Sequence, residues 1–183
     1  MLTDRSVSIV VPCYNEQDNI KALHERIAAV MADVTSDWEV VFVDNGSRDE
    51  SSKTFAEVAA QDPHVTVLSL SRNFGSQAAY SSGLDYARGN AVICMDGDLQ
   101  DPPEVIPQLV TRWVEGYEVV YGDRVRRQAG FAMRLANKAF YRLLRRFSYV
   151  DIPLDAGDFG LLDRRVVDIM NAMPERNRCV EPR

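Results

Sequence analysis

Short, mainly apolar runs alternate with longer amphipathic stretches through the first two thirds of the chain. The apolar runs predict buried strands at 8–11, 40–43, 65–70, 91–95 and 119–121. Between them, apolar residues recur three and four positions apart, which predicts helices at 23–34, 51–60, 75–87 and 103–115. Strands of this kind alternating with helices indicate an α/β fold, with helices on both faces of a mostly parallel sheet.

The pattern changes after residue 122. Residues 131–147 mix apolar and basic positions and predict a basic amphipathic helix, and residues 166–173 predict a last short helix. Residues 155–160 are rich in turn formers, so we expect an acidic turn there. The length favours a single domain, 1–183, with residues 1–121 and 122–183 as two differently built halves.

Charge is distributed unevenly within the net charge of −6. Residues 1–121 carry 8 Lys or Arg against 19 Asp or Glu, whereas residues 122–147 carry 8 against 1. This balance argues against a nucleic-acid-binding protein and indicates a local contact with anions or a membrane surface.

Targeting signals are not visible in the sequence. No stretch has the roughly 18 to 20 apolar residues of a membrane span, and no signal-peptide cleavage site follows the N-terminus. Three widely spaced cysteines fit a reducing cytoplasm. Cys13 and Cys94, at the ends of apolar runs, are expected to be buried thiols, and His24 and His64 are expected on the surface.

Three polar clusters follow predicted strands, beginning at Pro12, Asp44 and Asp96. Ligands of an open parallel sheet bind beyond the carboxyl ends of its strands, so we expect the clusters to converge on one edge. Asp44 is suited to accept hydrogen bonds from a base or ribose, although a turn residue fits equally well. Tyr14 is suited to stack on a base, and Glu16 either to accept a hydrogen bond or to favour a helix start.

Asp96 and Asp98 concentrate two carboxylates directly after a buried strand. Mg²⁺ or Mn²⁺ would neutralise this charge, because both ions prefer carboxylate and phosphate oxygens. Such an ion also stabilises a leaving diphosphate as a Lewis acid. The alternative is that these acids are solvated loop residues or helix caps, a role for which Asp101 before two prolines is suited.

The clusters together resemble a known family. The segments are Val10-Val11-Pro12-Cys13-Tyr14-Asn15-Glu16, Val43-Asp44-Asn45-Gly46-Ser47, Arg72-Asn73-Phe74-Gly75 and Asp96-Gly97-Asp98-Leu99-Gln100-Asp101-Pro102-Pro103-Glu104. In this order they resemble family 2 glycosyltransferases of the GT-A fold, which has a Rossmann-like sheet. The resemblance is strongest to the branch that transfers sugars to polyprenyl phosphates.

The resemblance implies a role for each segment. The residues that it assigns to the nucleotide are Pro12, Tyr14, Glu16, Asp44, Asp96 and Gly97. Those assigned to the metal are Asp98 and Gln100, which together with Asp96 would hold the metal and donor diphosphate. Those assigned to the acceptor phosphate are Arg124 and Arg134, and those assigned to catalysis are Asp98, Arg124 and Asp155. Residues 1–121 would then bind the nucleotide-sugar, and residues 122–183 would form the acceptor side.

The implied reaction is a metal-dependent, inverting transfer of a hexose from a UDP- or GDP-sugar to a polyprenyl phosphate. It would take place at the cytoplasmic face of the membrane, with the basic segment against anionic headgroups. The sequence leaves self-association of the chain open.

Some features depart from the resemblance or favour other functions. The ending at 179–183 differs from the usual apolar and basic continuation, so a truncated, inactive nucleotide-binding module is the alternative. Asn45 stands where an aspartate is common, and Gly160 where an arginine is frequent. A phosphohydrolase would place its acid pair after the first strand, and a dinucleotide oxidoreductase would have GxGxxG there.

Overall fold

A computed structural model describes residues 1–123 and 156–173 of the chain. The strands are β1 (Val7–Cys13), β2 (Trp38–Asp44), β3 (Val65–Ser69), β4 (Ala91–Cys94), β5 (Val119–Asp123) and β6 (Ala156–Asp163). The helices are α1 (Ile20–Val34), α2 (Ser51–Gln61), α3 (Ser76–Tyr86), the 3₁₀ turn η1 (Pro103–Val105), α4 (Ile106–Val114) and α6 (Arg164–Ala172).

The six strands form one sheet in the order β3-β2-β1-β4-β6-β5. β1 runs parallel to β2 and β4, and β2 runs parallel to β3, whereas β6 is antiparallel to both β4 and β5. Cys13 at the end of β1 pairs with Asp44 at the end of β2. The carboxyl ends of these two central strands are therefore level, and the polar segments that follow them begin at the same edge.

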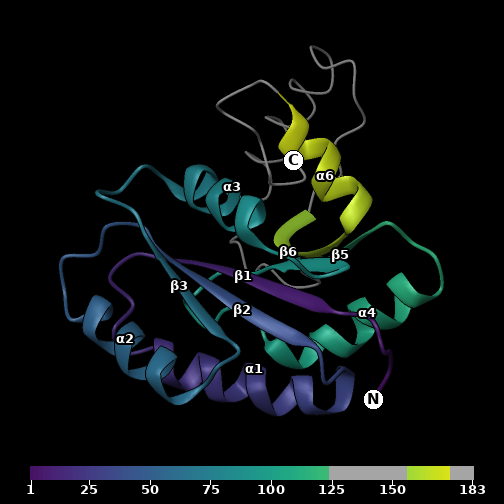
Figure 1. Cartoon of the computed structure of the whole chain (residues 1–183), viewed down its shortest axis with the longest axis horizontal. Coiled ribbons are helices and arrows are strands. Elements are labelled where there is room, and N and C mark those ends of the chain that lie inside the picture. The colour runs from purple at the N-terminus through teal and green to yellow at the C-terminus, as the bar shows by residue number, and fades with distance from the viewer. Residues whose placement is uncertain (124–155, 174–183) are drawn as a thin grey trace, which may run out of the picture.

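Helices cover both faces of the sheet (Figure 1). The face of α1, α2 and α4 holds the larger apolar core, which includes Ile9, Val11 and Cys13 of β1. The opposite face, with α3 and α6, holds a smaller core that includes Val10. Successive strand residues point to opposite faces, so a continuously apolar strand serves both cores. The α/β fold with a mostly parallel sheet is thus confirmed.

The predicted acidic turn at 155–160 is wrong for the residues described, because Ala156–Asp163 is a strand. Its glycines and aspartate satisfy a turn pattern locally, but hydrogen bonding to β4 on one side and β5 on the other determines the conformation. At Gly160 a side chain would lie only 2.9 Å from the Val120 carbonyl oxygen, so the small residue allows the strands to approach.

The remaining differences lie at element ends. α1 begins at Ile20, three residues before the predicted start, and the helix expected over 103–115 is divided into η1 and α4. The basic amphipathic helix expected over 131–147 lies outside the described residues. Within the parts of the chain that the structure does describe, no helix has the length and apolar character needed to cross a membrane.

The loop after β2 is joined to the loop between β3 and α3. The buried Asn45 side chain accepts the Phe74 N–H at 3.0 Å and donates to Asn73 Oδ1 at 3.3 Å. An aspartate could not make the second bond, because an ionised carboxylate has no hydrogen to donate. Gly46 has φ +72° and lies so close to the second loop that a Cβ would be 2.5 Å from Arg72 Cα.

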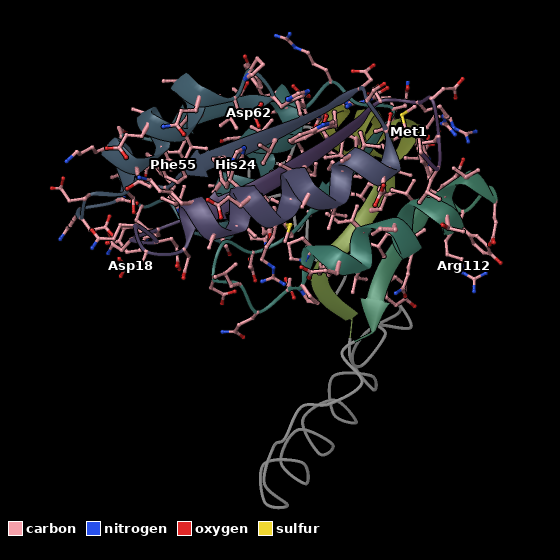
Figure 2. The ribbon with its side chains drawn as sticks, turned by 90° about the horizontal axis from the view of Figure 1, so that it is seen from below. Met1, Asp18, His24, Phe55, Asp62 and Arg112 are labelled. Atoms are coloured by element: carbon pink, nitrogen blue, oxygen red, sulfur yellow. The ribbon has the colours of Figure 1, made fainter. Side chains whose placement is uncertain are left out.

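Both histidines bind the same carboxylate. Asp62, directly after α2, has its Oδ2 atom 2.8 Å from His24 Nε2 of α1 and its Oδ1 atom 2.7 Å from His64 Nδ1 (His24 and Asp62 are labelled in Figure 2). The His64 ring also stacks on Trp38, with ring centroids 4.3 Å apart. The surface expectation is therefore wrong for His24, whose side chain is 16% exposed, because packing of α1 against α2 covers it.

Asp62→Asn should lower the free energy of unfolding by about 1–2 kcal/mol at pH 7, since hydrogen bonds to a charged group are lost. Burial alone would raise the pKa of Asp62, but hydrogen bonds from the His64 N–H and the two imidazoles lower it below its usual value. The contribution is therefore present above the unfolded-state pKa of about 3.9 and is lost as the pH falls through the lower folded-state value.

Urea unfolding at several pH values measures this difference. The gap between wild type and variant should narrow below about pH 4. Asp33→Asn, which removes an exposed carboxylate from α1, is the matched control and should change stability little. A gap that is absent at pH 7, or that persists undiminished at pH values where the Asp62 carboxyl is protonated, would show that the carboxylate does not stabilise the fold in this way.

Gly46→Ala should destabilise the protein by about 1–3 kcal/mol. The new methyl group would meet the backbone of the neighbouring loop, and residue 46 has a left-handed backbone conformation that alanine disfavours. Gly116→Ala is the control: Gly116 also has positive φ (+106°), but a Cβ there meets nothing within 4 Å. Chemical denaturation measures the stability lost in each variant. The loss in Gly116→Ala reports backbone strain alone, and the additional loss in Gly46→Ala reports the steric clash with the neighbouring loop. Equal losses in the two variants would contradict the loop contact.

Candidate functional site

Four carboxylates gather at the carboxyl edge of the sheet. Asp44 ends β2, Glu16 follows β1, and Asp96 and Asp98 follow β4; these four residues are here called the acid cluster. Cys13 lies among them: burial raises the pKa of its thiol well above the usual value, and the negative charges of all four carboxylates raise it further. The structure therefore brings together acids that lie up to 82 positions apart in the sequence.

The loop after β4 rests on the end of β1. At Gly97 a Cβ would lie 2.5 Å from Cys13 Sγ and 3.2 Å from the Pro12 carbonyl oxygen, so glycine allows this approach. Asp98, which is partly exposed, accepts the Gln100 N–H at 3.0 Å. Between them, Leu99 has φ +62°, which turns the chain back towards the sheet. The Asp98 carboxylate is thereby held in the loop beside the sheet edge.

Asp96 is contacted from α3. The Tyr80 hydroxyl donates a hydrogen bond to Asp96 Oδ1 at 2.9 Å, and the Asp96 N–H makes a long, 3.5 Å contact with Asp101 Oδ2. Asp101 is buried, and the cap residue of η1 is Pro102, which provides no side-chain cap. The expectation that Asp101 caps the helix is therefore wrong, because its side chain lies against the preceding loop.

Asp44 is built into the turn before α2. It is 3% exposed, and its two oxygens accept the Ser47 N–H at 2.9 Å and the Ser52 hydroxyl at 2.8 Å. The turn role considered for this residue is therefore present. A carboxylate oxygen can accept more than one hydrogen bond, so the expected nucleotide contact remains a prediction.

Glu16 and Tyr14 lie on the loop after β1. The partly buried Glu16 accepts the Asn19 side-chain amide at 2.6 Å, and its own N–H donates to Ser51 Oγ at 3.0 Å. Tyr14 is 37% exposed, so its ring is accessible at the rim. Asn15, which has φ +57°, accepts the Arg48 N–H at 2.8 Å and joins this loop to the one after β2.

The acid cluster offers oxygen donors that suit a divalent cation shared with a phosphorylated ligand. Among residues 1–123 and 156–173, no Lys or Arg side chain forms an ion pair with Glu16, Asp44 or Asp98. In the same residues, no group of three His, Cys, Asp or Glu side chains is arranged to hold a metal unaided. Mg²⁺ and Mn²⁺ sites commonly use one or two carboxylates with phosphate oxygens and water, so the oxygen donors present fit such an ion together with a diphosphate.

Several expected site residues are not brought together by the described structure. Gln100 is exposed and touches Asp98 through its backbone N–H, so its metal contact remains a prediction. Arg124, Arg134 and Asp155 lie outside the described residues. Conversely, sequence reasoning missed Tyr80, since an aromatic residue at a helical spacing reads as core. The serines that bind Glu16 and Asp44 were also missed, although the turn pattern around them was a usable signal.

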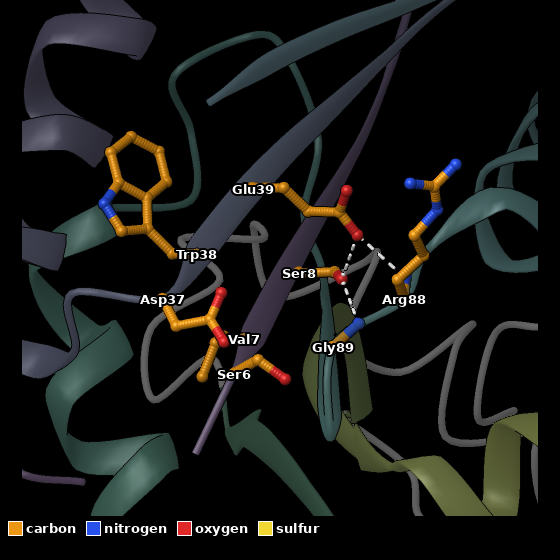
Figure 3. Close-up of a pocket in the computed structure, with 8 residues that line it drawn as sticks. All are labelled: Ser6, Val7, Ser8, Asp37, Trp38, Glu39, Arg88 and Gly89. Atoms are coloured by element: carbon orange, nitrogen blue, oxygen red, sulfur yellow. Dashed lines mark hydrogen bonds between the residues drawn. The ribbon is translucent and has the colours of Figure 1, made fainter. Parts of the chain in front are cut away.

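A cavity of about 340 Å³ lies at the opposite end of the strands, near Val7, Asp37 and Trp38 (Figure 3). Its polar side chains are largely paired with one another: Ser8 Oγ donates to Glu39 Oε1 at 2.7 Å and accepts the Gly89 N–H at 2.7 Å. Val7 begins β1 and Cys13 ends it, so this cavity is separate from the acid cluster. Its hydrogen bonds connect β1 and β2 to the turn before β4.

Comparison with known proteins gives consistent matches. The family model for glycosyl transferase family 2 matches residues 8–169. An uncharacterized glycosyltransferase of Bacillus subtilis, YkcC, is 45% identical over 94% of this chain and 54% of its own length. A bactoprenol glucosyl transferase of Shigella phage SfV is 38% identical over 93% of this chain and 56% of its own length. The chain thus spans about half the length of these curated relatives.

Solved structures show the same fold. A mannosyltransferase from Pyrobaculum calidifontis, in complex with GDP-Man and Mn²⁺, has a TM-score of 0.65 at 22% identity, over 94% of this chain and 48% of that one. A glucosyl-3-phosphoglycerate synthase from Mycobacterium tuberculosis, in complex with Mn²⁺, UDP and phosphoglyceric acid, has a TM-score of 0.63 at 21% identity. The match covers 88% of this chain and 56% of that one. At these identities the likeness establishes the GT-A fold. Because the family model covers most of its length and a relative is 45% identical across it, the chain belongs to glycosyltransferase family 2.

Proposed function

We propose that this chain is the catalytic part of a glycosyltransferase that moves a hexose from a UDP- or GDP-sugar to a polyprenyl phosphate. The observation that supports the proposal is the acid cluster, in which four carboxylates at or after the ends of β1, β2 and β4 all raise the pKa of one buried thiol. A bactoprenol glucosyl transferase among the relatives supports the lipid acceptor, and structural neighbours in complex with GDP-Man or UDP and Mn²⁺ support the donor and metal.

Each expected residue has a defined task in this proposal. Tyr14 stacks on the base, and Glu16 and Asp44 accept hydrogen bonds from the nucleoside. Pro12 and Gly97 bring the backbone close to the donor. Asp96, Asp98 and Gln100 hold Mg²⁺ or Mn²⁺ on the donor diphosphate, and such an ion supplies charge neutralisation to the departing nucleoside diphosphate.

The acceptor needs little activation. A phosphate monoester is ionised at neutral pH, since its second pKa is about 6, so no strong general base is required. Arg124 and Arg134 bind its oxygens, which suits the planar, multiple-donor guanidinium group. A phosphate oxygen forms a bond to the anomeric carbon while the bond to the diphosphate oxygen breaks, which inverts that carbon. Asp155 orients the acceptor or the sugar.

The basic segment within 122–147 supports a reaction at the membrane surface. Its Lys and Arg residues would lie near anionic headgroups at the cytoplasmic face, where each contributes about 1 kcal/mol of attraction. The alternative proposal is a nucleotide-binding module that transfers no sugar. The two proposals share donor binding and differ in turnover.

The wild-type chain should bind UDP or GDP more tightly with Mn²⁺ than without it, and Asp98→Asn should weaken the metal-dependent part about tenfold or more. The cause is the loss of a charged oxygen ligand. Isothermal titration with and without Mn²⁺ measures both effects. Asp18→Asn, which removes an exposed acid from the loop after β1, is the matched charge control. Wild-type protein that binds neither nucleotide in the presence of metal would refute the proposed function.

Turnover should be detectable with a short polyprenyl phosphate and one donor from a panel of UDP- and GDP-sugars, and EDTA should abolish it. Radiolabelled sugar entering the organic phase measures the rate, and NMR of the product should show the inverted anomer. Arg124→Ala should raise the acceptor KM, because a phosphate contact is removed. Donor binding without transfer to any acceptor lipid would instead establish the non-transferring module.

A further inference from the structure

α3 lies unusually close to the centre of the sheet. At Gly83 an added Cβ would collide with Val10 Cγ1 of β1 and lie 3.2 Å from Val43 Cγ2 of β2. A larger residue at this position would move the helix away from the strands. Tyr80 precedes Gly83 by three positions, which is about one helical turn, so it lies on the same face of the helix. The close packing of α3 on β1 and β2 at Gly83 therefore determines how far the Tyr80 side chain extends past the strands.

The Tyr80 side chain spans the space between core and acid cluster. The residue is 1% exposed and belongs to the apolar core with Val10, Val43 and Cys94. Its hydroxyl reaches beyond the end of β4 and donates to Asp96 Oδ1 at 2.9 Å. A buried ring has few accessible rotamers, because close packing restricts it. The donor is consequently held at a fixed place relative to the sheet.

The opposite side of the same loop is also restrained. Gly97 rests against Cys13, whose thiol faces the core of α1, α2 and α4 and contacts the Val11 carbonyl oxygen at 3.7 Å. The loop of the acid pair therefore lies between Cys13 on one face of the sheet and Tyr80 on the other. Tyr80 is the contact that acts directly on a carboxylate.

We infer that Tyr80 is a positioning residue that orients the Asp96 carboxylate for binding the donor–metal complex. This inference rests on the proposed function and adds a residue to its site. The hydroxyl is a neutral donor, so it stabilises the negative charge of Asp96 without neutralising it. An arginine or lysine at this place would neutralise that charge. A carboxylate with one oxygen held in this way has less reorganisation to undergo when a cation binds.

Tyr80→Phe tests the inference, because it removes the hydroxyl and keeps the buried ring. We expect the affinity for Mn²⁺ with UDP or GDP to fall about tenfold, as is usual when a partner of a metal-binding carboxylate is lost. The metal-free affinity for the nucleotide should change by less than about twofold, since only the metal-binding carboxylate loses a partner. With turnover, the donor KM should rise while kcat at saturating metal and donor stays within about threefold.

Two comparisons separate positioning from a general structural effect. Tyr86→Phe removes a hydroxyl from the same helix at a position that is 39% exposed, and it should leave both affinities unchanged. In an Asp96→Asn background, Tyr80→Phe should cause no further loss of metal-dependent binding, because the two residues act through one contact. Thermal unfolding and near-UV circular dichroism verify that each variant is folded at the assay temperature.

The outcomes are distinct. Unchanged metal-dependent affinity in a folded Tyr80→Phe protein would overturn the positioning role and leave the proposed function intact. Equal losses with and without metal, or additive losses in the double variant, would also overturn it, since they indicate a structural role. Wild-type protein that binds no metal–nucleotide complex would refute the proposed function and the inference together.

Discussion

The gathering of four carboxylates at one sheet edge is the constraint on which the rest of the site depends. Their negative charges all raise the pKa of the buried Cys13 thiol. The described part of the chain supplies no basic side chain as an ion-pair partner for Glu16, Asp44 or Asp98. A bound cation with a phosphorylated ligand is the partner that the arrangement favours.

Neutral hydrogen-bond donors contact the acids of the cluster. Serine and backbone donors bind Asp44, an asparagine amide binds Glu16, and the Tyr80 hydroxyl binds Asp96. These donors restrain each carboxylate but leave its charge in place. Glycines at 46, 83 and 97 have a complementary task, since each allows a backbone segment to approach where a side chain would collide. The site is thus pre-arranged by small and neutral residues.

The second half of the chain contrasts with this arrangement. Residues 122–147 carry the basic charge that the acid cluster lacks, and the acceptor-side residues Arg124 and Arg134 fall within them. In the proposed reaction this separation is useful, because a donor bound through a cation and an acceptor phosphate bound through arginines would not compete for the same protein groups. The curated relatives extend to about twice the length of this chain.

The sequence by itself determined the fold class and predicted the sheet edge at which the polar segments gather. Apolar runs, helical periodicity and the polar segments after the strands are local signals, and a parallel sheet brings the ends of its strands to one edge. Only the tertiary structure showed that residues 156–163 form a strand, because its pairing partners β4 and β5 are distant in sequence. The same holds for Tyr80 with Asp96 and for Asp62 with His24, which are 16 and 38 positions apart. Such contacts arise from how helices pack on the sheet, and no local pattern encodes the distance between two packed elements.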